Sequence, residues 1–218
     1  MVRKELNINI KKIIFVILAG GKSKRFGGGF KTFSLINNKS ILDIIIEKLQ
    51  RNKIEIFINV NESHDKFSVT KLPIILDKKK GHLGPLAGIH ASMEMCVKNY
   101  PNKEWIFTVP SDTPFLPENI LEKFSEKIDL NSDILIARSD NKIHPVVSMW
   151  RISLLKSIER ELDQNNRKIM TCVEKHNHSF VDFESEIIDP FFNINTKEDL
   201  KTAENFGDQI LKKSIIYR

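Results

Sequence analysis

The chain has 218 residues, of which 41% are hydrophobic and 28% are charged, a composition typical of a globular protein with a sizeable core. Its formal net charge of +6 suits either a nucleic acid or a polyphosphate ligand. No basic run alternates with aromatic residues, which disfavours nucleic-acid binding. No segment approaches the roughly 20 apolar residues that cross a membrane, which disfavours a membrane protein.

Basic residues precede an apolar stretch near the N-terminus, as they do in a signal peptide. The stretch has only about six or seven residues, however, and it leads into glycines and cations instead of a cleavage site. The two cysteines, Cys96 and Cys172, are far apart, and we expect both to be inert, reduced thiols. Together these features predict a cytoplasmic protein.

In chain order, the patterns predict a strand at 13–18, a helix at 40–50, strands at 54–60 and 72–76, a helix at 85–98, a strand at 104–109, a helix at 117–128, strands at 133–138 and 145–150, helices at 152–163 and 168–176, a strand at 180–183 and a helix at 196–206. Ser40 and Thr196 are placed to cap their helices, each with an aspartate three residues later. The alternation of strand and helix predicts an α/β fold with a mostly parallel sheet covered on both faces. No linker interrupts it, so we expect a single domain over 1–218.

The first strand leads into the loop LAGGKSKRFGGGFK, residues 18–31. Glycines let the backbone approach an anion closely, and Arg25 and the loop lysines can neutralise phosphate charge. This composition favours a triphosphate site over a solvated basic turn. The loop is not a P-loop, because Val16 stands where that motif has its first glycine, and it also lacks the dinucleotide fingerprint.

Polar side chains also follow the next strands. Asp112, between two prolines after the strand at 104–109, suits Mg²⁺ together with phosphate oxygens, although it could equally cap a turn. Asn59, Asn61 and Asp77 end the second and third strands and offer acceptors to a base or a ribose. Guanine carries two neighbouring donors, N1–H and the N2 amino group, that one carboxylate can accept. His144 is expected to be structural, and we identify no Ser-His-Asp or Cys-His arrangement.

These motifs together resemble those of the molybdenum cofactor guanylyltransferases. The loop LAGGKSKRFGGGFK resembles that family's L-A-G-G-x-x-x-R-x-G-G-x-D-K. Further blocks follow in the family's order: GPLAGI at 84–89, SDTPFLP at 111–117, HPVVSM at 144–149 and FFNINTKEDL at 191–200. The resemblance covers nearly the whole chain and implies a Rossmann-like three-layer α/β/α domain. One departure is Phe30, where the family has an aspartate before the loop lysine.

The resemblance implies a reaction in which GMP is transferred from GTP to the terminal phosphate of the molybdenum-pterin cofactor, with release of pyrophosphate. The implied GTP-binding residues are Leu18, Ala19, Gly20, Gly21, Lys31, Asn59, Asp77 and Asp112. Asp112 would also hold Mg²⁺, and catalysis would depend on Arg25, Lys31 and Asp112. On the pterin side the matching positions are Arg167, Asn193 and Asn195.

Alternatives stay open at this point. A cytidylyltransferase for the same cofactor or a sugar-phosphate nucleotidylyltransferase would use the same chemistry, although LAGG favours the guanylyl branch over the LAAG of the cytidylyl relatives. A non-catalytic module that binds nucleotide and delivers cofactor is a different class, and a basic RNA-binding protein is a third. The expected partners are GTP, the pterin cofactor, molybdenum-insertion proteins and molybdoenzyme chaperones, without nucleic acid or membrane.

Overall fold

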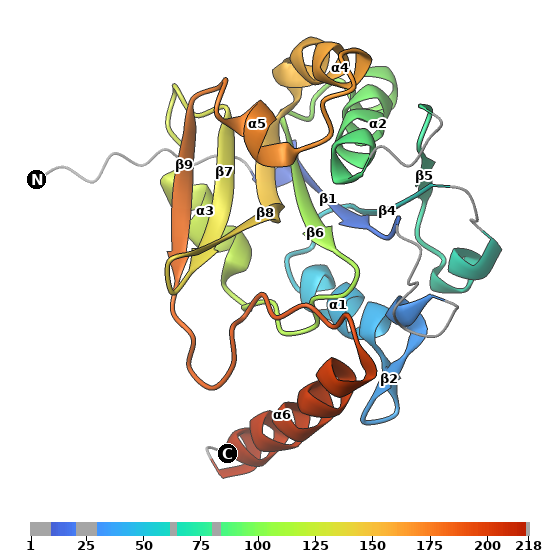
Figure 1. Cartoon of the computed structure of the whole chain (residues 1–218), viewed down its shortest axis with the longest axis vertical. Helices are drawn as coiled ribbons and strands as arrows, with labels where there is room; N and C mark the ends of the chain where they lie inside the picture. Colours follow the sequence, from blue (N-terminus) through green and yellow to red (C-terminus); the bar gives the residue numbers. More distant parts are fainter. Residues whose placement is uncertain (1–9, 21–29, 62–64, 80–83, 217–218) are drawn as a thin grey trace, which may run out of the picture.

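The computed structural model describes residues 10–20, 30–61, 65–79 and 84–216 (Figure 1). Within them, seven strands form one sheet in the order β5-β4-β1-β6-β8-β7-β9. The strands are β1 (Ile13–Leu18), β4 (Ile56–Val60), β5 (Ile74–Leu76), β6 (Trp105–Pro110), β7 (Ile134–Ser139), β8 (Lys142–Arg151) and β9 (His178–Phe183). In this sheet β8 runs antiparallel to both of its neighbours, and every other pairing is parallel. The predicted α/β class with a mostly parallel sheet is confirmed.

Helices cover both faces of the sheet (Figure 1). They are α1 (Ile41–Gln50), α2 (Pro85–Asn99), α3 (Ile120–Lys127), α4 (Leu155–Asp163) and α5 (Ile169–Val173), whereas α6 (Lys197–Ile216) extends away from the sheet (Figure 1). Short 3-10 turns add η1 (Ile10–Lys12), η3 (Lys31–Phe33), η4 (Asp65–Thr70) and η5 (Ile152–Leu154). The prediction of one domain over 1–218 stays a prediction.

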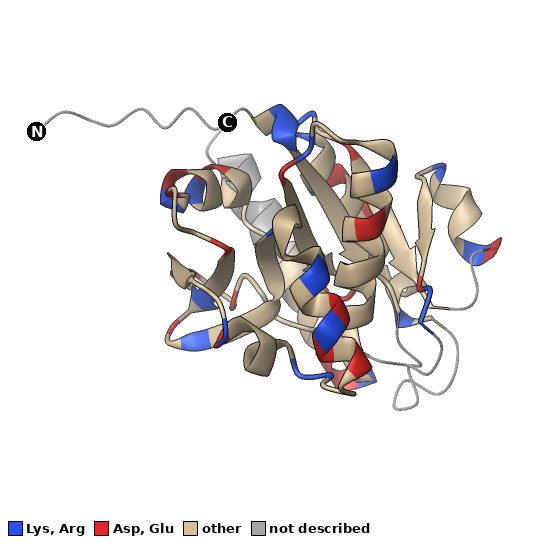
Figure 2. Cartoon of the chain, turned by 90° about the horizontal axis from the view of Figure 1, so that it is seen from above, with Lys and Arg blue, Asp and Glu red and all other residues tan. Residues whose placement is uncertain are grey.

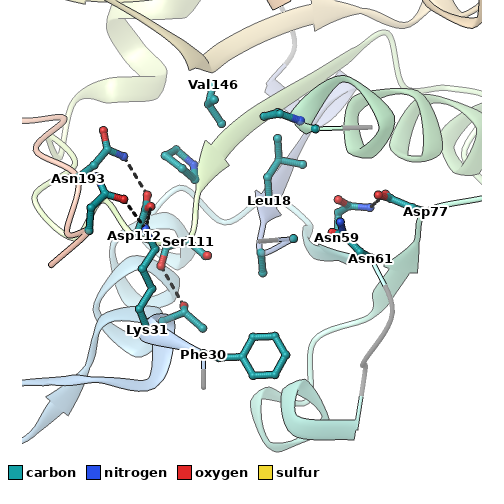
Figure 3. A pocket seen from close by; sticks show the side chains of 17 residues that line it. Leu18, Phe30, Lys31, Asn59, Asn61, Asp77, Ser111, Asp112, Val146 and Asn193 are labelled. Atoms are coloured by element: carbon teal, nitrogen blue, oxygen red, sulfur yellow. Dashed lines mark hydrogen bonds and ion pairs between the residues drawn. The ribbon is translucent and has the colours of Figure 1, made fainter. Parts of the chain in front are cut away.

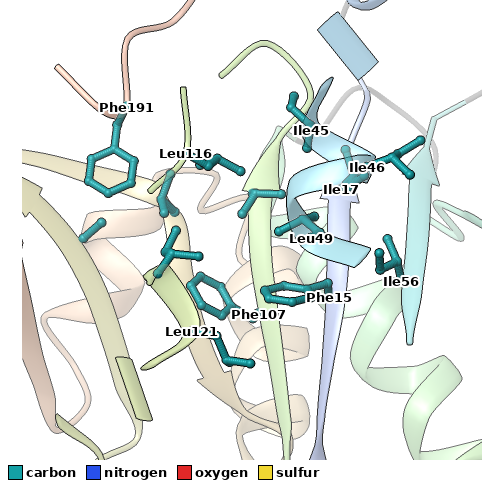
Figure 4. Close-up of a cluster of buried hydrophobic side chains, with 14 of the residues drawn as sticks. Phe15, Ile17, Ile45, Ile46, Leu49, Ile56, Phe107, Leu116, Leu121 and Phe191 are labelled. Atoms are coloured by element: carbon teal, nitrogen blue, oxygen red, sulfur yellow. The ribbon is translucent and has the colours of Figure 1, made fainter. Parts of the chain in front are cut away.

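The β1 strand shows why the layers form. All six of its residues are buried, and successive side chains point to opposite faces. Phe15 and Ile17 pack in a cluster with residues of α1 and α3, where the Phe15 and Phe107 rings lie 5.2 Å apart (Figure 4). Ile14 and Val16 belong to a second cluster with residues of α2, α4 and α5. A strand that is apolar at every position therefore requires a layer of helices on each side.

Both predicted caps are present. The Asp43 N–H donates to the Ser40 hydroxyl at the start of α1 (3.0 Å), and the Asp199 N–H donates to the Thr196 hydroxyl at the start of α6 (3.0 Å). Each cap satisfies an N–H group that a helix terminus leaves without an intrahelical partner. The α2 helix begins with Pro85 after Gly84, which has φ of +75°.

Several boundaries differ from the prediction. The α3 helix begins at Ile120 instead of 117, and α6 continues to Ile216 instead of ending at 206. The β8 strand begins at Lys142 and includes Pro145, which lies where the pairing with β7 shifts register between Ile136 and Ala137. A proline lacks the N–H that a regular ladder needs, so a strand tolerates it best at such an irregularity.

The sequence analysis missed a small hairpin, β2 (Leu35–Ile36) with β3 (Lys39–Ser40). Asn37 and Asn38 form its turn with φ of 48° and 66°, the left-handed conformation that asparagine tolerates and that a two-residue hairpin loop requires. Strands of two residues are too short to show an alternating pattern, which explains the omission.

The two cysteines and the two tryptophans are buried in the core. Cys96 and Cys172 are free and buried, and burial raises their thiol pKa to about 12 and about 11. Such thiols are inert at neutral pH. Trp105 and Trp150 are core residues, 1% and 0% exposed.

Charged residues of both signs are interspersed along the described helices, and the strands carry few of them (Figure 2). No helix in the described part of the chain is long and apolar enough to cross a membrane. The predictions that the protein binds no nucleic acid and is cytoplasmic stay predictions.

Candidate active site

A pocket of about 450 Å³ opens at the carboxyl ends of the central parallel strands. The chain runs from β1 to β4 and β5 on one side, then crosses back to β6 on the other side of β1. Ligands of open α/β sheets bind at such a reversal of strand order. The described residues that line the pocket are Leu18, Ala19, Gly20, Phe30, Lys31, Thr32, Asn59, Asn61, Asp77, Gly84, Pro85, Pro110, Ser111, Asp112, Val146, Asn193 and Asn195.

One side of the pocket holds a charged cluster (Figure 3). Lys31 Nζ lies 2.5 Å from Asp112 Oδ2 and donates to Asn195 Oδ1 at 2.7 Å. Asn193 Nδ2 donates to Asp112 Oδ1 at 2.9 Å and to the Thr113 hydroxyl at 2.9 Å. The Lys31 and Asp112 side chains are 19% and 16% exposed, so solvent screens their attraction only in part.

The elements fix this cluster through backbone contacts. The Ser111 N–H donates to the Leu18 carbonyl at 3.1 Å, which continues the β1–β6 pairing one step beyond the strands. The Thr32 hydroxyl in η3 donates to the Ser111 carbonyl at 2.9 Å. The Ile194 N–H donates to the Asp112 carbonyl at 3.0 Å. Three segments far apart in the sequence are thereby held together around Asp112.

The capping motif of α6 supports the same cluster from the other side. Asp199 Oδ2 accepts hydrogen bonds from the Asn195 and Thr196 N–H groups, each at 2.8 Å. Burial opposes ionisation of Asp199, but these hydrogen bonds outweigh it and lower the pKa of the carboxyl. The backbone of Asn195 is therefore tied to the first turn of a helix.

The opposite side of the pocket is polar without a cation among its described residues (Figure 3). Asn59 is 2% exposed, and its Nδ2 donates to Asp77 Oδ1 at 2.9 Å and to the Ile75 carbonyl at 3.3 Å. Asn61 lies beside Gly20, where a Cβ would fall 1.6 Å from Asn61 Oδ1. Gly20 therefore has to be glycine for Asn61 to occupy this place.

Phe30 takes part in an aromatic cluster at the pocket edge. Its ring centroid lies 5.5 Å from that of Phe67 and 6.2 Å from that of Phe33, both in edge-to-face arrangements. Lys66 Nζ lies 5.2 Å from the Phe30 centroid. The side chain that replaces the family's aspartate thus packs against η4, while Asp112 and Asn195 orient Lys31.

The structure brings together most of the predicted site residues. Leu18, Ala19, Gly20, Lys31, Asn59, Asp77, Asp112, Asn193 and Asn195 all line the one pocket. Arg167 is outside this set: its guanidinium is exposed and donates to Asn165 Oδ1, although its carbonyl oxygen lies 3.7 Å from the position of a Cβ on Gly84. Gly21 and Arg25 lie outside the described residues. The roles assigned to all these residues stay predictions.

The pocket also contains residues that the sequence analysis did not select. Thr32, Ser111 and Val146 line it. Ser111 lies in a quoted motif block beside Asp112, which is a signal that could have identified it. Val146 also lies in a quoted block, HPVVSM, but neither it nor Thr32 has a side chain that suggests chemistry, because a threonine in a turn and a valine in a strand are ordinary residues there.

His144 is structural, as predicted. It is 6% exposed, and burial lowers its pKa. Its Nε2 lies 2.6 Å from the Ser139 hydroxyl, which donates to Asp189 Oδ1 at 2.8 Å. Because that hydroxyl proton is directed at Asp189, His144 donates to Ser139 and cannot act as its base. The three side chains fasten the segment that leads to Asn193 and Asn195 onto β7 and β8.

The oxygen ligands in the pocket fit Mg²⁺ only in combination with a bound phosphate. The described residues contain no group of three or more His, Cys, Asp or Glu side chains that could hold a metal ion alone. Asp112 offers a single, partly exposed carboxylate in the pocket, which fits an ion that takes one or two carboxylates and completes its shell with phosphate oxygens and water.

Comparisons with known proteins show to which family the chain is similar. Residues 15–179 match the family described as MobA-like NTP transferase domain. A molybdenum cofactor guanylyltransferase of Rhodopseudomonas palustris (strain BisB5) is 34% identical over 194 residues, covering 88% of this chain and 92% of the relative. One of Nitrobacter hamburgensis is 32% identical over 204 residues, covering 93% and 98%. Molybdopterin-guanine dinucleotide biosynthesis protein A from Archaeoglobus fulgidus has a similar crystal structure, with a TM-score of 0.70 and 26% identity, covering 90% of this chain and 99% of that chain.

Fold, pocket and relatives define the class of the protein as a nucleotidyltransferase, an enzyme. The family follows from the extent of the match: the chain belongs to the MobA-like NTP transferases, as its resemblance to the molybdenum cofactor guanylyltransferases predicted. Transferases of this kind generally use a divalent metal.

Proposed function

We propose that the protein transfers GMP from GTP to the terminal phosphate of the molybdenum-pterin cofactor and releases pyrophosphate, with Mg²⁺ as the cofactor of the reaction. The observation that carries the proposal is a single pocket with the Lys31–Asp112–Asn195 cluster on one side and the Asn59–Asp77 pair on the other. The relatives are molybdenum cofactor guanylyltransferases, and this name indicates both the acceptor and the base.

The two sides of the pocket suit the two ends of GTP. The triphosphate would lie against Leu18, Ala19 and Gly20 and toward Lys31, where backbone N–H groups and a cation can meet its charge. The guanine would lie toward Asn59 and Asp77, where the Asp77 carboxylate can accept its N1–H and N2 donors and Asn59 holds that carboxylate in place. Gly21 and Arg25, which lie outside the described residues, would contribute further phosphate contacts, as the resemblance implies.

The reaction requires no protein base. An oxygen of the pterin's terminal phosphate forms a bond to the α-phosphorus of GTP, the bond from that phosphorus to its bridging oxygen breaks, and pyrophosphate leaves with the electron pair. A phosphate monoester is already anionic, so the protein contributes position and charge neutralisation. Lys31 and Arg25 stabilise the charge that grows on pyrophosphate. Mg²⁺ held by Asp112 would supply positive charge to the phosphate oxygens.

The acceptor would approach from the side of Asn193 and Asn195. Both lie on the segment that reaches Asp112 from the far end of the sheet, and both offer amide groups to a polar ring system or a phosphate. Arg167 would contribute from outside the pocket. Molybdenum-insertion proteins and molybdoenzyme chaperones would supply the substrate and receive the product.

A nucleotide panel tests the proposal. In a thermal-shift assay with Mg²⁺, GTP should raise the melting temperature more than ATP, CTP or UTP, because a ligand stabilises the state that binds it. Pyrophosphate release on mixing GTP, Mg²⁺ and the pterin cofactor should follow. A preference for CTP would indicate a cytidylyltransferase. Release of pyrophosphate only in the presence of a sugar phosphate would indicate a sugar-phosphate nucleotidylyltransferase. Binding of GTP without release of pyrophosphate would indicate a delivery module.

A further inference from the structure

Glu161, near the end of α4, is a buried charged residue that the proposed reaction does not use. It is 6% exposed, and a carboxylate in such a place has to be paired and hydrogen-bonded. Lys175 Nζ lies 2.6 Å from Glu161 Oε1, and Asn166 Nδ2 donates to Glu161 Oε2. The hydrogen bond from Lys175 is the main cause that lowers the pKa of Glu161, although burial opposes it. The side chain is therefore ionised at neutral pH.

The contacts of Glu161 fix the loop between α4 and α5. Asn166 is held twice, because its backbone N–H also donates to the Glu161 carbonyl, at 2.9 Å. Asn165 has φ of 59°, a left-handed conformation that turns the chain at this point. Lys175 lies just after α5, so one carboxylate joins the end of α4, the loop and the segment that follows α5.

The loop carries Arg167 beside the pocket. The Arg167 carbonyl oxygen lies 3.7 Å from the position of a Cβ on Gly84, which lines the pocket at the start of α2. The guanidinium is exposed, and its Nε and Nη2 donate to the same oxygen of Asn165. A phosphate offers arginine two charged acceptors, and such hydrogen bonds are about twice as strong as neutral ones. A phosphate that arrives here can therefore take the guanidinium from Asn165.

The position of this loop along the sheet separates it from the guanine side of the pocket. The loop leads into α5, which packs against β8. Asn59 and Asp77 lie at the ends of β4 and β5, and β1 and β6 stand between those strands and β8. The loop therefore comes from the side on which the acceptor would approach.

We propose that Glu161 is a positioning residue for the acceptor's phosphate, because it holds the loop from which Arg167 binds that phosphate. The inference rests on the proposed function, in which the acceptor carries a terminal phosphate. Arg167 touches the substrate, whereas Glu161 acts only through the loop.

The first arm of the test compares KM values for the two substrates. Glu161→Gln keeps the size of the side chain but removes its charge and one acceptor oxygen, and Asn166→Ala removes the side-chain contact from the loop. Each should raise the KM for the pterin cofactor by about fivefold or more, the effect of a lost hydrogen bond, and change the KM for GTP by less than about twofold. Glu159→Gln, at a surface ion pair with Lys156 on the same helix, should change neither value.

The second arm asks whether Glu161 acts through Arg167. Arg167→Ala should raise the KM for the pterin cofactor by about tenfold or more, as expected for the loss of a hydrogen bond to a charged group. In that background Glu161→Gln should add less than about twofold, because the group that the loop presents is gone. If the two single effects instead multiply in the double variant, the residues act independently and the inference is overturned.

The possible failures are distinguishable. A wild type that releases no pyrophosphate with GTP and the pterin cofactor would overturn the proposed function and, with it, the inference. An active wild type whose KM for the cofactor is unchanged in Glu161→Gln and Asn166→Ala would overturn only the role of Glu161, as would an equal rise in both KM values. If Glu161→Gln does not fold, Asn166→Ala decides the question in the same comparison and in the same Arg167→Ala background.

Discussion

Lys31 is held in place by side chains from two other parts of the chain. In the guanylyltransferase motif an aspartate precedes this lysine, whereas in this chain Phe30 precedes it. If the aspartate only orients the lysine, another group must do so in this chain. Asp112 and Asn195 contact the ammonium group directly and can fill that role.

Replacing Asp112 with asparagine tests its role as a Mg²⁺ ligand. Asp112→Asn should lose most of the turnover at limiting Mg²⁺, because a neutral amide is a poor Mg²⁺ ligand and a weak partner for Lys31. The fold should survive, since substitutions away from the core rarely unfold a domain. Initial rates over a Mg²⁺ titration, with the melting temperature measured in parallel, check this. Asp163→Asn, at an exposed ion pair with Lys79, is the control. Near-normal rates at limiting Mg²⁺ would contradict the assignment.

Removing the loop cation tests the role of Lys31. Lys31→Ala should slow the reaction by about 10²-fold or more, which is the loss seen when a preorganised donor to a developing charge is removed. Steady-state rates at saturating GTP measure it. Lys39→Ala, at an exposed lysine, serves as the control. A loss below about threefold would show that Lys31 does not stabilise the leaving pyrophosphate.

The Phe30→Asp substitution restores the family's residue. We expect turnover to change by less than about tenfold, because Asp112 and Asn195 already orient Lys31. We also expect a lower melting temperature, since the edge-to-face contacts of Phe30 with Phe33 and Phe67 are lost and such aromatic pairs contribute about 0.5–1.5 kcal/mol each. A rise of about tenfold or more in turnover would instead mark Phe30 as a weakened site.

At the scale of elements, the pocket is lined by residues at the ends of strands and near the starts of helices. The β1, β4, β5 and β6 strands end at its floor, while the start of α6 fixes Asn195 through the capping pair of Thr196 and Asp199. The cap of α1 at Ser40 has the same local chemistry, but Ser40 does not line the pocket. The two caps therefore form a matched pair for experiment.

Thr196→Ala and Ser40→Ala should each cost about 1 kcal/mol of stability, the usual effect of losing a side-chain cap, which corresponds to about 2–4 °C in melting temperature. Only Thr196→Ala should also raise the KM for the pterin cofactor, because its hydroxyl accepts the Asp199 N–H and so positions the carboxylate that holds the backbone of Asn195. Thermal melts and cofactor titrations of both variants check the difference. Equal KM values would mean that the α6 cap has a purely structural role.

At the scale of the whole molecule, two buried histidines make stability depend on pH. His90 is 3% exposed and faces Glu94, Glu159, Lys78 and Lys79, whereas His144 is 6% exposed and faces Asp189 and Lys142. Burial lowers the pKa of both from 6.5. Below about pH 6.5 the unfolded chain binds protons at these side chains that the folded chain does not, so the free energy of unfolding falls as the pH falls.

We therefore expect the free energy of unfolding to decrease between pH 7 and pH 5, and the decrease to be smaller in His90→Gln and in His144→Gln than in wild type. Urea unfolding curves at the two pH values measure it. Each variant is compared with its own value at pH 7, so that any loss of packing cancels. An unchanged slope in both variants would show that these histidines do not carry the pH dependence.

Local sequence patterns predict most of the secondary structure and the types of side chain at the site. A strand that is apolar at every position, capping pairs such as Ser40 with Asp43, and prolines at helix starts depend on neighbours within a few residues, so they can be recognised from the sequence. The motif blocks also identified Lys31, Asp112 and the two asparagines near 194 as candidates. The hairpin at 35–40 was not predicted, because its strands are too short to show an alternating pattern.

Which of these side chains come into contact depends on the tertiary fold. The order β5-β4-β1-β6 brings the ends of four strands to one pocket, and the return of the chain after β9 brings Asn193 and Asn195 to Asp112. The approach of the Arg167 carbonyl to Gly84 joins the loop after α4 to the start of α2. No local pattern encodes such contacts, because they depend on the order of the strands and on how closely each helix packs on the sheet.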